Sequence, residues 1–421
     1  MPVKGRRDLG RFDVAIVGSG FAGSILARCL VRRGMKIALV ERARHPRFAL
    51  GESSTPLGAL SLERLAERYG LPDLDAMAAW GRWRRNLPEL GRGLKRGFTF
   101  YRHHPGGAFA NDSGNGARLL VAASPSDECA DLHWVRADVD AALADRAAEA
   151  GAGLLEEHAV VGVEERGDAL ELALDAPAGR ARLLASRVVD ASGGAGVVAR
   201  ALGAVERPAP LASSLVYAHV EGLPRLAEVA PAASFEDAPY AEEAAAVHHL
   251  LDEGWLYVLR FDHGVASVGL VTDGDAGPAP SGDGRARLEA AAGRYPSLAA
   301  SLAACRPVVG WRTADGVAYR LDRAGGERWL ALPHTLGFVD PMFSTGIAWS
   351  LHAVERLIPV LLGGGDADAW ARSLERDADR LTDLVVAARR AQPCFEAFVA
   401  VSWAYFAAAS WLETRQRIEG G

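Results

Sequence analysis

Cysteine is scarce in this chain of 421 residues, and its four copies lie far apart. Cys29, Cys129, Cys305 and Cys394 form no short pair, which excludes a disulfide scaffold and a zinc site built from clustered cysteines. Neither charge dominates, since the net charge is −6, and this disfavours a broad nucleic-acid-binding face. Hydrophobic residues make up 49% and charged residues 24%, proportions that exclude a wholly disordered chain.

The basic N-terminus lacks the apolar stretch and the small-residue cleavage site of a signal peptide. Its charged residues run directly into an apolar strand. We therefore expect a reduced, cytoplasmic protein. The length predicts about two to three domains, at roughly 150 residues each.

Lysine is nearly absent: of the 47 lysines and arginines, only Lys4, Lys36 and Lys95 are lysines. Arginine serves wherever a positive charge is enough, but it offers no readily deprotonated amine. A lysine that persists in such a chain is therefore a candidate for a role that needs the amine itself.

The N-terminal pattern predicts a β-α-β unit with a parallel sheet. Residues 12–17 are typical of a buried strand, residues 22–33 of a helix and residues 37–40 of a second buried strand. Further helices are predicted over 56–69, 136–150 and 346–362, and from 366 to the end. Strands are predicted over 160–163, 170–174, 182–189, 213–222, 255–271 and 329–332, with a loop over 273–284. No linker separates these segments, which predicts interleaved domains.

The turn after the first strand is Gly18-Ser19-Gly20-Phe21-Ala22-Gly23, a dinucleotide-binding fingerprint. Gly18 permits the tight turn, Gly20 lets the backbone approach a pyrophosphate, and Gly23 allows close packing of helix and strand. Glu41 ends the next strand at the usual spacing and would accept hydrogen bonds from ribose hydroxyls. Because an acidic residue disfavours a 2′-phosphate, NADP is disfavoured, while NAD and FAD both remain open here.

Three further blocks stand in a fixed order behind this turn. They are Arg-Phe-Ala-Leu-Gly-Glu-Ser at 47–53, Asp-Ala-Ser-Gly at 190–193, and Gly-Phe-Val-Asp-Pro-Met-Phe-Ser-Thr-Gly-Ile at 337–347. Together the four blocks resemble the flavin-dependent halogenases and, more loosely, FAD-dependent aromatic hydroxylases and geranylgeranyl reductases. The resemblance covers roughly residues 12–365 and implies FAD as the cofactor.

The resemblance implies an α/β fold with a three-layer, Rossmann-type FAD-binding domain. A mixed or antiparallel substrate-binding sheet is inserted into it, and helices follow at the C-terminus. The FAD-binding domain would comprise 10–80, 120–205 and 305–365. The substrate-binding sheet would comprise 81–119 and 206–304, and the helical region 366–421.

The resemblance also implies a set of site residues. Those expected to bind FAD are Gly18, Gly20, Phe21, Ala22, Gly23, Glu41, Arg47, Glu52, Ser53, Arg136, Asp190, His334, Asp340, Thr345, Gly346 and Ile347. Those expected to line the substrate pocket are Trp255, Tyr257, Phe100 and Phe343, and the expected catalytic residues are Lys95 and Ser344. An arginine fork such as that of Arg136 suits phosphate oxygens, and Thr345 is also a candidate N-cap.

Lys95 precedes Arg96, a glycine and the aromatic strand Phe-Thr-Phe, as the lysine does in the halogenase block. In that family reduced FAD and oxygen convert a halide ion to hypohalous acid, which travels a short tunnel to the lysine. The amine binds the oxidant or becomes a haloamine and then halogenates an electron-rich ring. Burial lowers the pKa of a lysine, which makes a free amine available for this chemistry. A surface lysine is the alternative.

Three positions depart from the halogenase pattern. The W-x-W-x-I-P motif becomes Trp255-Leu256-Tyr257-Val258-Leu259-Arg260. In the halogenases this motif is thought to keep the substrate away from the flavin, so its change makes hydroxylation an alternative activity. The Gly-Asp before the last block becomes Pro333-His334, where His334 would replace the aspartate that holds the ribityl chain. Phe343 stands where tryptophan halogenases have glutamate, which favours phenols and carrier-bound aromatic substrates.

The favoured function is therefore halogenation of a small electron-rich aromatic substrate, with halide and with reduced FAD from a separate reductase. A flavin-dependent monooxygenase or dehydrogenase of an aromatic or isoprenoid-like substrate is the first alternative. A flavin-binding protein without turnover is the second. The substrate, the halide and the oligomeric state stay open.

No metal site is expected, because His103-His104 and His248-His249 are adjacent pairs, and adjacent side chains do not face one site. The turn Gly18-Ser19-Gly20 is too short for a G-x-S-x-G hydrolase motif. The last helix, from Phe395 to Trp411, is rich in aromatic residues. We expect it to pack over the protein and the substrate pocket rather than to contact a membrane.

Overall fold

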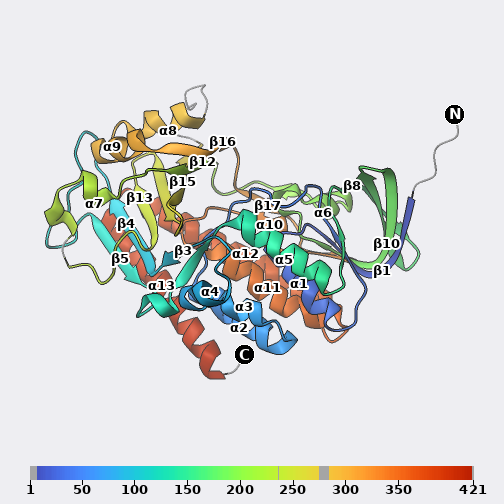
Figure 1. Ribbon diagram of the computed structural model, residues 1–421. Helices are drawn as coiled ribbons and strands as arrows, with labels where there is room; N and C mark the ends of the chain where they lie inside the picture. The colour runs from blue at the N-terminus through green and yellow to red at the C-terminus, as the bar shows by residue number, and fades with distance from the viewer. Residues whose placement is uncertain (1–6, 236, 275–283, 420–421) are drawn as a thin grey trace.

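The computed structural model describes residues 7–235, 237–274 and 284–419. Figure 1 shows the two large sheets toward opposite ends of the molecule, with the long helices α11 and α12 between them. The mixed α/β fold and its Rossmann-type unit agree with the fold class that the sequence predicts.

The first sheet contains the predicted β-α-β unit. Its strands run in the order β7-β2-β1-β10-β9-β8, with β18 beside β10. Strands β7, β2, β1, β10 and β18 pair in parallel, and β8 and β9 add an antiparallel meander. The strands are β1 Arg7–Val17, β2 Ile37–Val40, β7 Gly153–Leu155, β8 Ala159–Arg166, β9 Ala169–Ala176, β10 Gly179–Asp190 and β18 Trp329–Ala331.

Four longer helices accompany this sheet: α1 Phe21–Val31, α2 Pro56–Tyr69, α5 Arg136–Glu149 and α11 Thr345–Leu361. The bounds of α2 are those predicted, because Pro56 suits the first turn and Gly70, with φ of 63°, ends the helix. Helix α1 begins at Phe21 and so places its N-terminus directly at the glycine turn.

The second sheet has the order β16-β12-β15-β14-β13-β4-β5. Its strands are β4 Gly97–Arg102, β5 Arg118–Ala122, β12 Ser213–Glu221, β13 Ala246–Leu250, β14 Gly254–Arg260, β15 Val265–Asp273 and β16 Arg306–Ala314. One face packs against α8 Gly284–Ala292 and α9 Pro296–Ala304. The other face packs against the C-terminal helices and carries the aromatic residues expected near the substrate. The period of two thus sends alternate side chains to two different environments.

Smaller elements connect the two sheets. The short strands are β3 Arg92–Lys95, β6 Asp131–Trp134, β11 Glu206–Arg207, β17 Tyr319–Leu321 and β19 Gly337–Phe338. The short helices are α3 Pro72–Ala76, α4 Trp80–Asn86, α6 Val197–Ala201, α7 Leu226–Val229 and α10 Pro333–Leu336. The 3-10 turns are η1 Asp127–Cys129, η2 Gly193–Ala195 and η3 Ala232–Phe235.

The C-terminal segment differs from the continuous helix that the sequence predicts. It forms α12 Ala367–Ala391 and α13 Phe395–Glu419, separated at Pro393, whose backbone has no N–H to donate. The predicted strand 255–271 is likewise two strands, β14 and β15, joined by a turn at 261–264.

The predicted division into domains stays a prediction, and two strands cross its boundaries. Strand β5 spans the boundary at 119/120, and β16 lies in a segment assigned to the FAD-binding domain, yet both pair in the second sheet. Sequence alone does not give the pairing partner of a short strand. Most of the predicted loop 273–284 lies outside the described residues.

Helix α13 is long and apolar enough, by length and composition, to cross a membrane. The same test is passed by the core helix of a soluble protein. Phe395, Phe398 and Ser402 are buried against the protein, whereas Trp403 and Trp411 are 52% and 62% exposed. The expected packing of this helix is therefore confined to one face.

Candidate functional site

The glycine turn has the geometry that the fingerprint predicts. Gly18 has φ of +114°, and a Cβ on it would lie 2.3 Å from the carbonyl oxygen of Ala191. A Cβ on Gly23 would lie 2.1 Å from the oxygen of Gly18. Both positions therefore require glycine, and α1 begins against the end of β1.

Gly20 faces charged side chains rather than another backbone segment. A Cβ on Gly20 would lie 3.6 Å from a nitrogen of Arg136, 3.7 Å from an oxygen of Asp140 and 3.8 Å from a nitrogen of Arg47. Two guanidinium groups and one carboxylate thus stand at the N-terminus of α1, whose N-cap residue, Gly20, has no side chain to cap it. Cationic forks and a helix N-terminus together favour phosphate oxygens.

Asp140 fixes these two arginines in place. Arg136 donates to it at 2.9 and 2.8 Å, and Arg47 lies 3.6 Å from the same carboxylate. Asp140 also accepts a hydrogen bond from the backbone N–H of Phe21 at 3.1 Å. Since Asp140 follows Arg136 by one helical turn, α5 positions both arginines at the start of α1.

Glu41 ends β2, as predicted, and is 5% exposed. Burial opposes its charge, but the positive charge of Arg47 and hydrogen bonds from the N–H groups of Ala43 and Ser19 hold the pKa of Glu41 below its ordinary value. An ionised carboxylate next to the glycine turn is a suitable acceptor for ribose hydroxyls.

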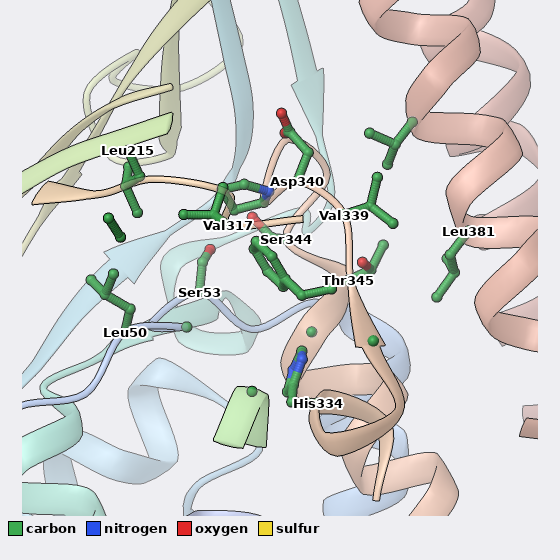
Figure 2. Close-up of a pocket in the computed structure, with 18 of the residues that line it drawn as sticks. Leu50, Ser53, Leu215, Val317, His334, Val339, Asp340, Ser344, Thr345 and Leu381 are labelled. Atoms are coloured by element: carbon green, nitrogen blue, oxygen red, sulfur yellow. The ribbon is translucent and has the colours of Figure 1, made fainter. Parts of the chain in front are cut away.

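A cavity of about 570 Å³ begins at Leu50–Ser53, and Gly18–Gly23, Glu41, Arg47 and Arg136 are not among its lining residues. Figure 2 shows Leu50, Ser53, His334, Thr345 and other lining residues, with Leu381 of α12 across from Leu215 of β12. Of the predicted residues, the lining includes Glu52, Ser53, Trp255, Tyr257, His334, Asp340, Ser344, Thr345, Gly346 and Ile347. The cavity therefore joins residues of the second sheet with the segment 50–53 and with α11 and α12.

His334 faces this cavity at the position where the aspartate of the halogenase pattern is missing. It is half-buried, and desolvation together with the charge of Arg136 lowers the pKa of His334 to about 4. A Cβ on Gly346 would lie 2.9 Å from its Nε2 atom. The side chain is therefore a neutral imidazole, which can accept or donate one hydrogen bond toward a ligand.

The N-cap of α11 is Ser344 rather than Thr345. Ser344 has φ of 53° and ψ of 32°, and Thr345 is the first helical residue. The run Asp340-Pro341-Met342-Phe343-Ser344 turns sharply here, since the N–H of Ser344 donates to the oxygen of Pro341 at 3.0 Å. This left-handed turn carries the chain across the cavity wall.

Asp190 lies next to the site but faces its own loop. Its carboxylate accepts from the N–H and hydroxyl of Ser192 at 3.0 and 2.6 Å, and from Val198 and Ala199 at 2.7 and 2.9 Å. Glu52 similarly pairs with His219 at 2.6 Å. These contacts make Asp190 a support for the turn that holds Gly18.

Lys95 is completely buried, at the C-terminal end of β3. Its ammonium nitrogen donates to the backbone oxygen of Ser54 at 2.5 Å and lies 4.1 Å from the centre of the Phe98 ring. Burial lowers the pKa of Lys95, while the charge of Asp131 opposes that effect. The neighbouring Ser53 lines the cavity, so one residue separates the partner of Lys95 from that space.

The four predicted aromatic pocket residues divide into two pairs. Trp255 and Tyr257 line the cavity, and the indole N–H of Trp255 donates to Asp340 at 3.2 Å. Phe100 and Phe343 instead belong to an aromatic cluster under α13. Its ring contacts include Phe343 with Tyr405 at 4.5 Å, Phe98 with Phe406 at 4.8 Å and Phe100 with Phe398 at 5.2 Å.

His248 lines the cavity and is a residue that the sequence interpretation set aside. It stacks on Phe100 at 4.5 Å and on Trp255 at 5.0 Å, while its neighbour His249 contacts His103 at 3.0 Å on the other face of the sheet. Adjacent strand residues do face opposite sides, as expected. The signal available in the sequence was the alternation along β13, in which Ala246 and Leu250 face the same side as His248. Among the described residues, no group of three His, Cys, Asp or Glu side chains could hold a metal ion.

These residues fit FAD. Arg47 and Arg136 lie at the N-terminus of α1, Glu41 lies beside the same turn, and His334 and Gly346 line the cavity. The Arg47 Nε and Ser53 Oγ atoms are buried without a hydrogen-bond partner, as expected of groups that contact a ligand.

Several curated relatives that match this chain over most of its length are halogenases, which confirms the predicted resemblance. The tetracycline 7-halogenase of Kitasatospora aureofaciens is 28% identical over 356 residues, 82% of this chain and 62% of the relative. The monodechloroaminopyrrolnitrin halogenase PrnC of Pseudomonas fluorescens is 27% identical over 388 residues, 89% of this chain and 66% of the relative. The chain thus spans a little under two thirds of the length of these relatives.

Solved halogenase structures share the fold. Halogenase PltM in complex with phloroglucinol and FAD superposes with a TM-score of 0.84 at 23% identity, covering 97% of this chain and 84% of PltM. The myxobacterial chondrochloren halogenase CndH gives a TM-score of 0.69 at 22% identity, covering 90% of this chain and 80% of CndH. A profile of FAD dependent oxidoreductases matches residues 13–338. With the glycine turn and Glu41, this match over most of its length shows that the chain belongs to the FAD-dependent oxidoreductase family.

Proposed function

We propose that this protein is a flavin-dependent halogenase that acts on a small, electron-rich aromatic substrate. The single observation that carries the proposal is Lys95, a completely buried lysine beside the cofactor cavity in a chain with three lysines. The similarity to two curated halogenases supports the same reaction class.

The chain's own residues would divide the work as follows. The N-terminus of α1 with Arg47 and Arg136 would hold the pyrophosphate of FAD, Glu41 its ribose, and the start of α11 would lie against its ring. Bound there in its reduced form, the flavin would supply the activation of oxygen that converts a halide ion to hypohalous acid.

Lys95 would then receive the halogen. In the neutral amine, the nitrogen lone pair attacks the halogen of hypohalous acid, so that an N–X bond forms and the O–X bond breaks. The displaced hydroxide leaves with one amine proton as water. The aromatic ring next takes the halogen from nitrogen, which returns a proton to the amine. Fixing the oxidant on one buried nitrogen would direct it to one ring carbon.

The pocket walls favour an apolar aromatic substrate. Leu215, Val317, Leu381 and Val385 line the cavity together with Trp255. We infer that a separate reductase supplies reduced FAD, since the chain has a single dinucleotide-binding fingerprint, and that the protein acts in the cytoplasm.

A monooxygenase is the second candidate, and one observation favours it. Trp255 and Tyr257 line the same cavity as Gly346 and Ile347, so a substrate that contacts the aromatic residues also reaches the cofactor side. Direct oxygen transfer needs that proximity, whereas transfer through Lys95 does not.

The test supplies reduced FAD, oxygen, bromide and a panel of phenols, indoles and pyrroles, and detects products by mass spectrometry. We expect a brominated product that depends on bromide. The Lys95→Arg and Lys95→Met variants should lose product by at least about 100-fold, the lower range for removing a proton-transfer group. Both should still bind FAD and oxidise reduced FAD. A hydroxylated product without halide, formed equally by Lys95→Arg, would instead establish the monooxygenase.

A further inference from the structure

Lys95 has a buried carboxylate directly across from it. Strands β3 and β6 pair antiparallel, and the register sets Lys95 opposite Asp131. Directly opposed residues of an antiparallel pair project to the same face, so both side chains enter one space. Lys95 is 0% and Asp131 4% exposed.

Asp131 has a carboxylate oxygen that accepts no hydrogen bond. Its Oδ2 atom is buried without a hydrogen-bond partner, although carboxylate oxygens in protein interiors are nearly always bonded. Lys95 donates to the backbone oxygen of Ser54 instead. The Nδ1 atom of His133, two residues along β6, and the Oγ atom of Ser53 are buried without partners as well. Ser53 and His133 form an isolated β-bridge, and Ser53 lines the cofactor cavity.

The other charged and titratable groups near this pair come from three elements. His133 on β6 and His248 on β13 have their pKa values lowered to about 3, chiefly by burial and then by the charge of Lys95, so both are neutral. Glu413 and Arg417 of α13 act on Asp131 with opposite signs. Asp131 is therefore the carboxylate that acts on Lys95.

We propose that Asp131 sets the protonation state of Lys95. It is a positioning residue whose negative charge allows the buried amine to exist both as the ammonium and as the neutral amine. The inference rests on the proposed function, because only an amine that reacts with an oxidant must give up a proton and regain it. Without Asp131 the buried ammonium would have no compensating charge, and Lys95 would stay neutral throughout the neutral pH range. With Asp131, the negative charge of the carboxylate favours the ammonium form, so the buried amine can both release a proton and regain it.

The pKa directions agree with an electrostatic coupling of the two groups. Burial lowers the pKa of Lys95 and raises the pKa of Asp131, and each partner's charge opposes the effect of burial on the other. The two forms of the amine therefore come close in free energy, which an isolated lysine in the same space would not achieve.

The experiment uses the scarcity of lysine. Protein labelled with ¹³C at lysine Cε gives three lysine side-chain signals, and Lys95→Met assigns that of Lys95, while the exposed Lys36 is the internal reference. A pH titration then reads the Lys95 amine in full-length flavin-free protein, without any assay of activity. In Asp131→Asn the Lys95 titration should move to lower pH by about 1–3 pH units, the usual effect of removing an opposite charge.

Asp127→Asn is the matched control, because Asp127 lies four residues away, is 54% exposed and pairs with Arg96 at 2.6 Å. It should leave the Lys95 titration unchanged. An unchanged titration in Asp131→Asn would overturn the proposal. If that variant does not fold, carboxyl-labelled aspartate reads the reverse effect: Lys95→Met should raise the pKa of Asp131, and its failure to do so would overturn the proposal equally.

The two proposals fail separately. A shifted Lys95 titration without any halogenated product would reject the halogenase function and leave the pairing intact. A halogenated product that depends on Lys95, with no shift in Asp131→Asn, would reject only the role of Asp131.

Discussion

Glu41 is the residue through which the glycine turn would recognise the adenosine half of FAD. Its carboxylate already accepts hydrogen bonds from the N–H and hydroxyl of Ser19, both at 3.2 Å, and so is fixed at the end of β2. Replacing Glu41 with alanine should weaken FAD binding by about 1.5–3 kcal/mol, the range for hydrogen bonds to a charged group. This corresponds to a rise in Kd of about tenfold to 100-fold.

Fluorescence titration of flavin-free protein measures this Kd. Glu67→Ala, an exposed glutamate of α2, is the control and should bind FAD normally. Equal Kd values for Glu41→Ala and the wild type would remove Glu41 from the cofactor site.

Single residues were predictable from sequence where one backbone position imposes one chemical requirement. Gly18 and Gly23 belong to that group, because the close approaches at the turn leave no space for a Cβ atom. His248 and Asp131 do not, because their importance comes from neighbours on other strands. The sequence shows the alternation along β13, but it does not show that Phe100 and Trp255 stack on either side of His248.

At the scale of elements, the pairing of β4 with β13 brings His103, which directly follows β4, next to His249 of β13. His103 and His249 meet at 3.0 Å on the face away from the cavity. Burial lowers the pKa of His103 to about 3, against about 6.5 in an unfolded chain. The unfolded state therefore binds the proton first as pH falls below 6.5, and the stability that neutral His103 contributes is lost progressively toward pH 3.

His103→Gln cannot take up this proton, so its stability relative to the wild type should increase as the pH falls. The difference in free energy of unfolding between the two proteins should shift in favour of the variant by about 2 kcal/mol from pH 7 to pH 5, at about 1.4 kcal/mol per pH unit below 6.5. Urea unfolding at both pH values measures it, with the exposed His263→Gln as the control. A difference that is the same at pH 7 and pH 5 would contradict a buried neutral His103.

The end of α12 is tied to the cavity wall by a buried arginine. Arg389 lies 3.8 Å from Asp340, which in turn accepts from the indole of Trp255, and it also pairs with Asp273 at the end of β15. Burial raises the pKa of Asp340, and the charge of Arg389 opposes this. Arg389 thus links α12, the loop before α11 and the second sheet.

Arg389→Met should cost about 3–5 kcal/mol of stability, because it leaves a buried carboxylate without its cation. The exposed neighbour Arg390→Met is the matched control and should be nearly neutral. Urea unfolding compares the two variants, and similar values for both would show that Arg389 does not support the cavity wall.

Elements with strong local signals were predictable, and their long-range partners were not. Residues 56–69 form a helix with the predicted bounds because Pro56 and Gly70 act locally. Strand β16 lies in a segment that the predicted division gives to the FAD-binding domain, yet it pairs with β12 in the second sheet. Sequence alone did not show this pairing, because β12 lies about 90 residues earlier. Pro393 was a signal for a helix end, since proline cannot continue a helix. The helix-like pattern on both sides of it nevertheless led to the prediction of one continuous helix.

At the scale of the whole molecule, the two large sheets do different work. The first is parallel at its centre and presents the carboxyl ends of β1, β2 and β10 to one crevice, where a dinucleotide binds in such folds. The second presents apolar and aromatic side chains to the cavity from β12 and β14. Leu215 of this sheet and Leu381 of α12 lie on opposite sides of the cavity, with His334 and Thr345 between them (Figure 2).

This arrangement leads to the last prediction, which concerns the source of electrons. The chain has one glycine fingerprint, and in the described part of the structure it opens α1 beside Glu41, the position assigned to FAD. The second sheet is built mainly from antiparallel strands, which do not form the phosphate-binding turn of a β-α-β unit. The purified protein with bound FAD should therefore oxidise NADH or NADPH only at a background rate. Adding an unrelated flavin reductase should start halide-dependent turnover. Stopped-flow spectroscopy of flavin reduction separates the two cases, and rapid bleaching of the flavin by NADH or NADPH alone would mean that a nicotinamide site exists on this chain.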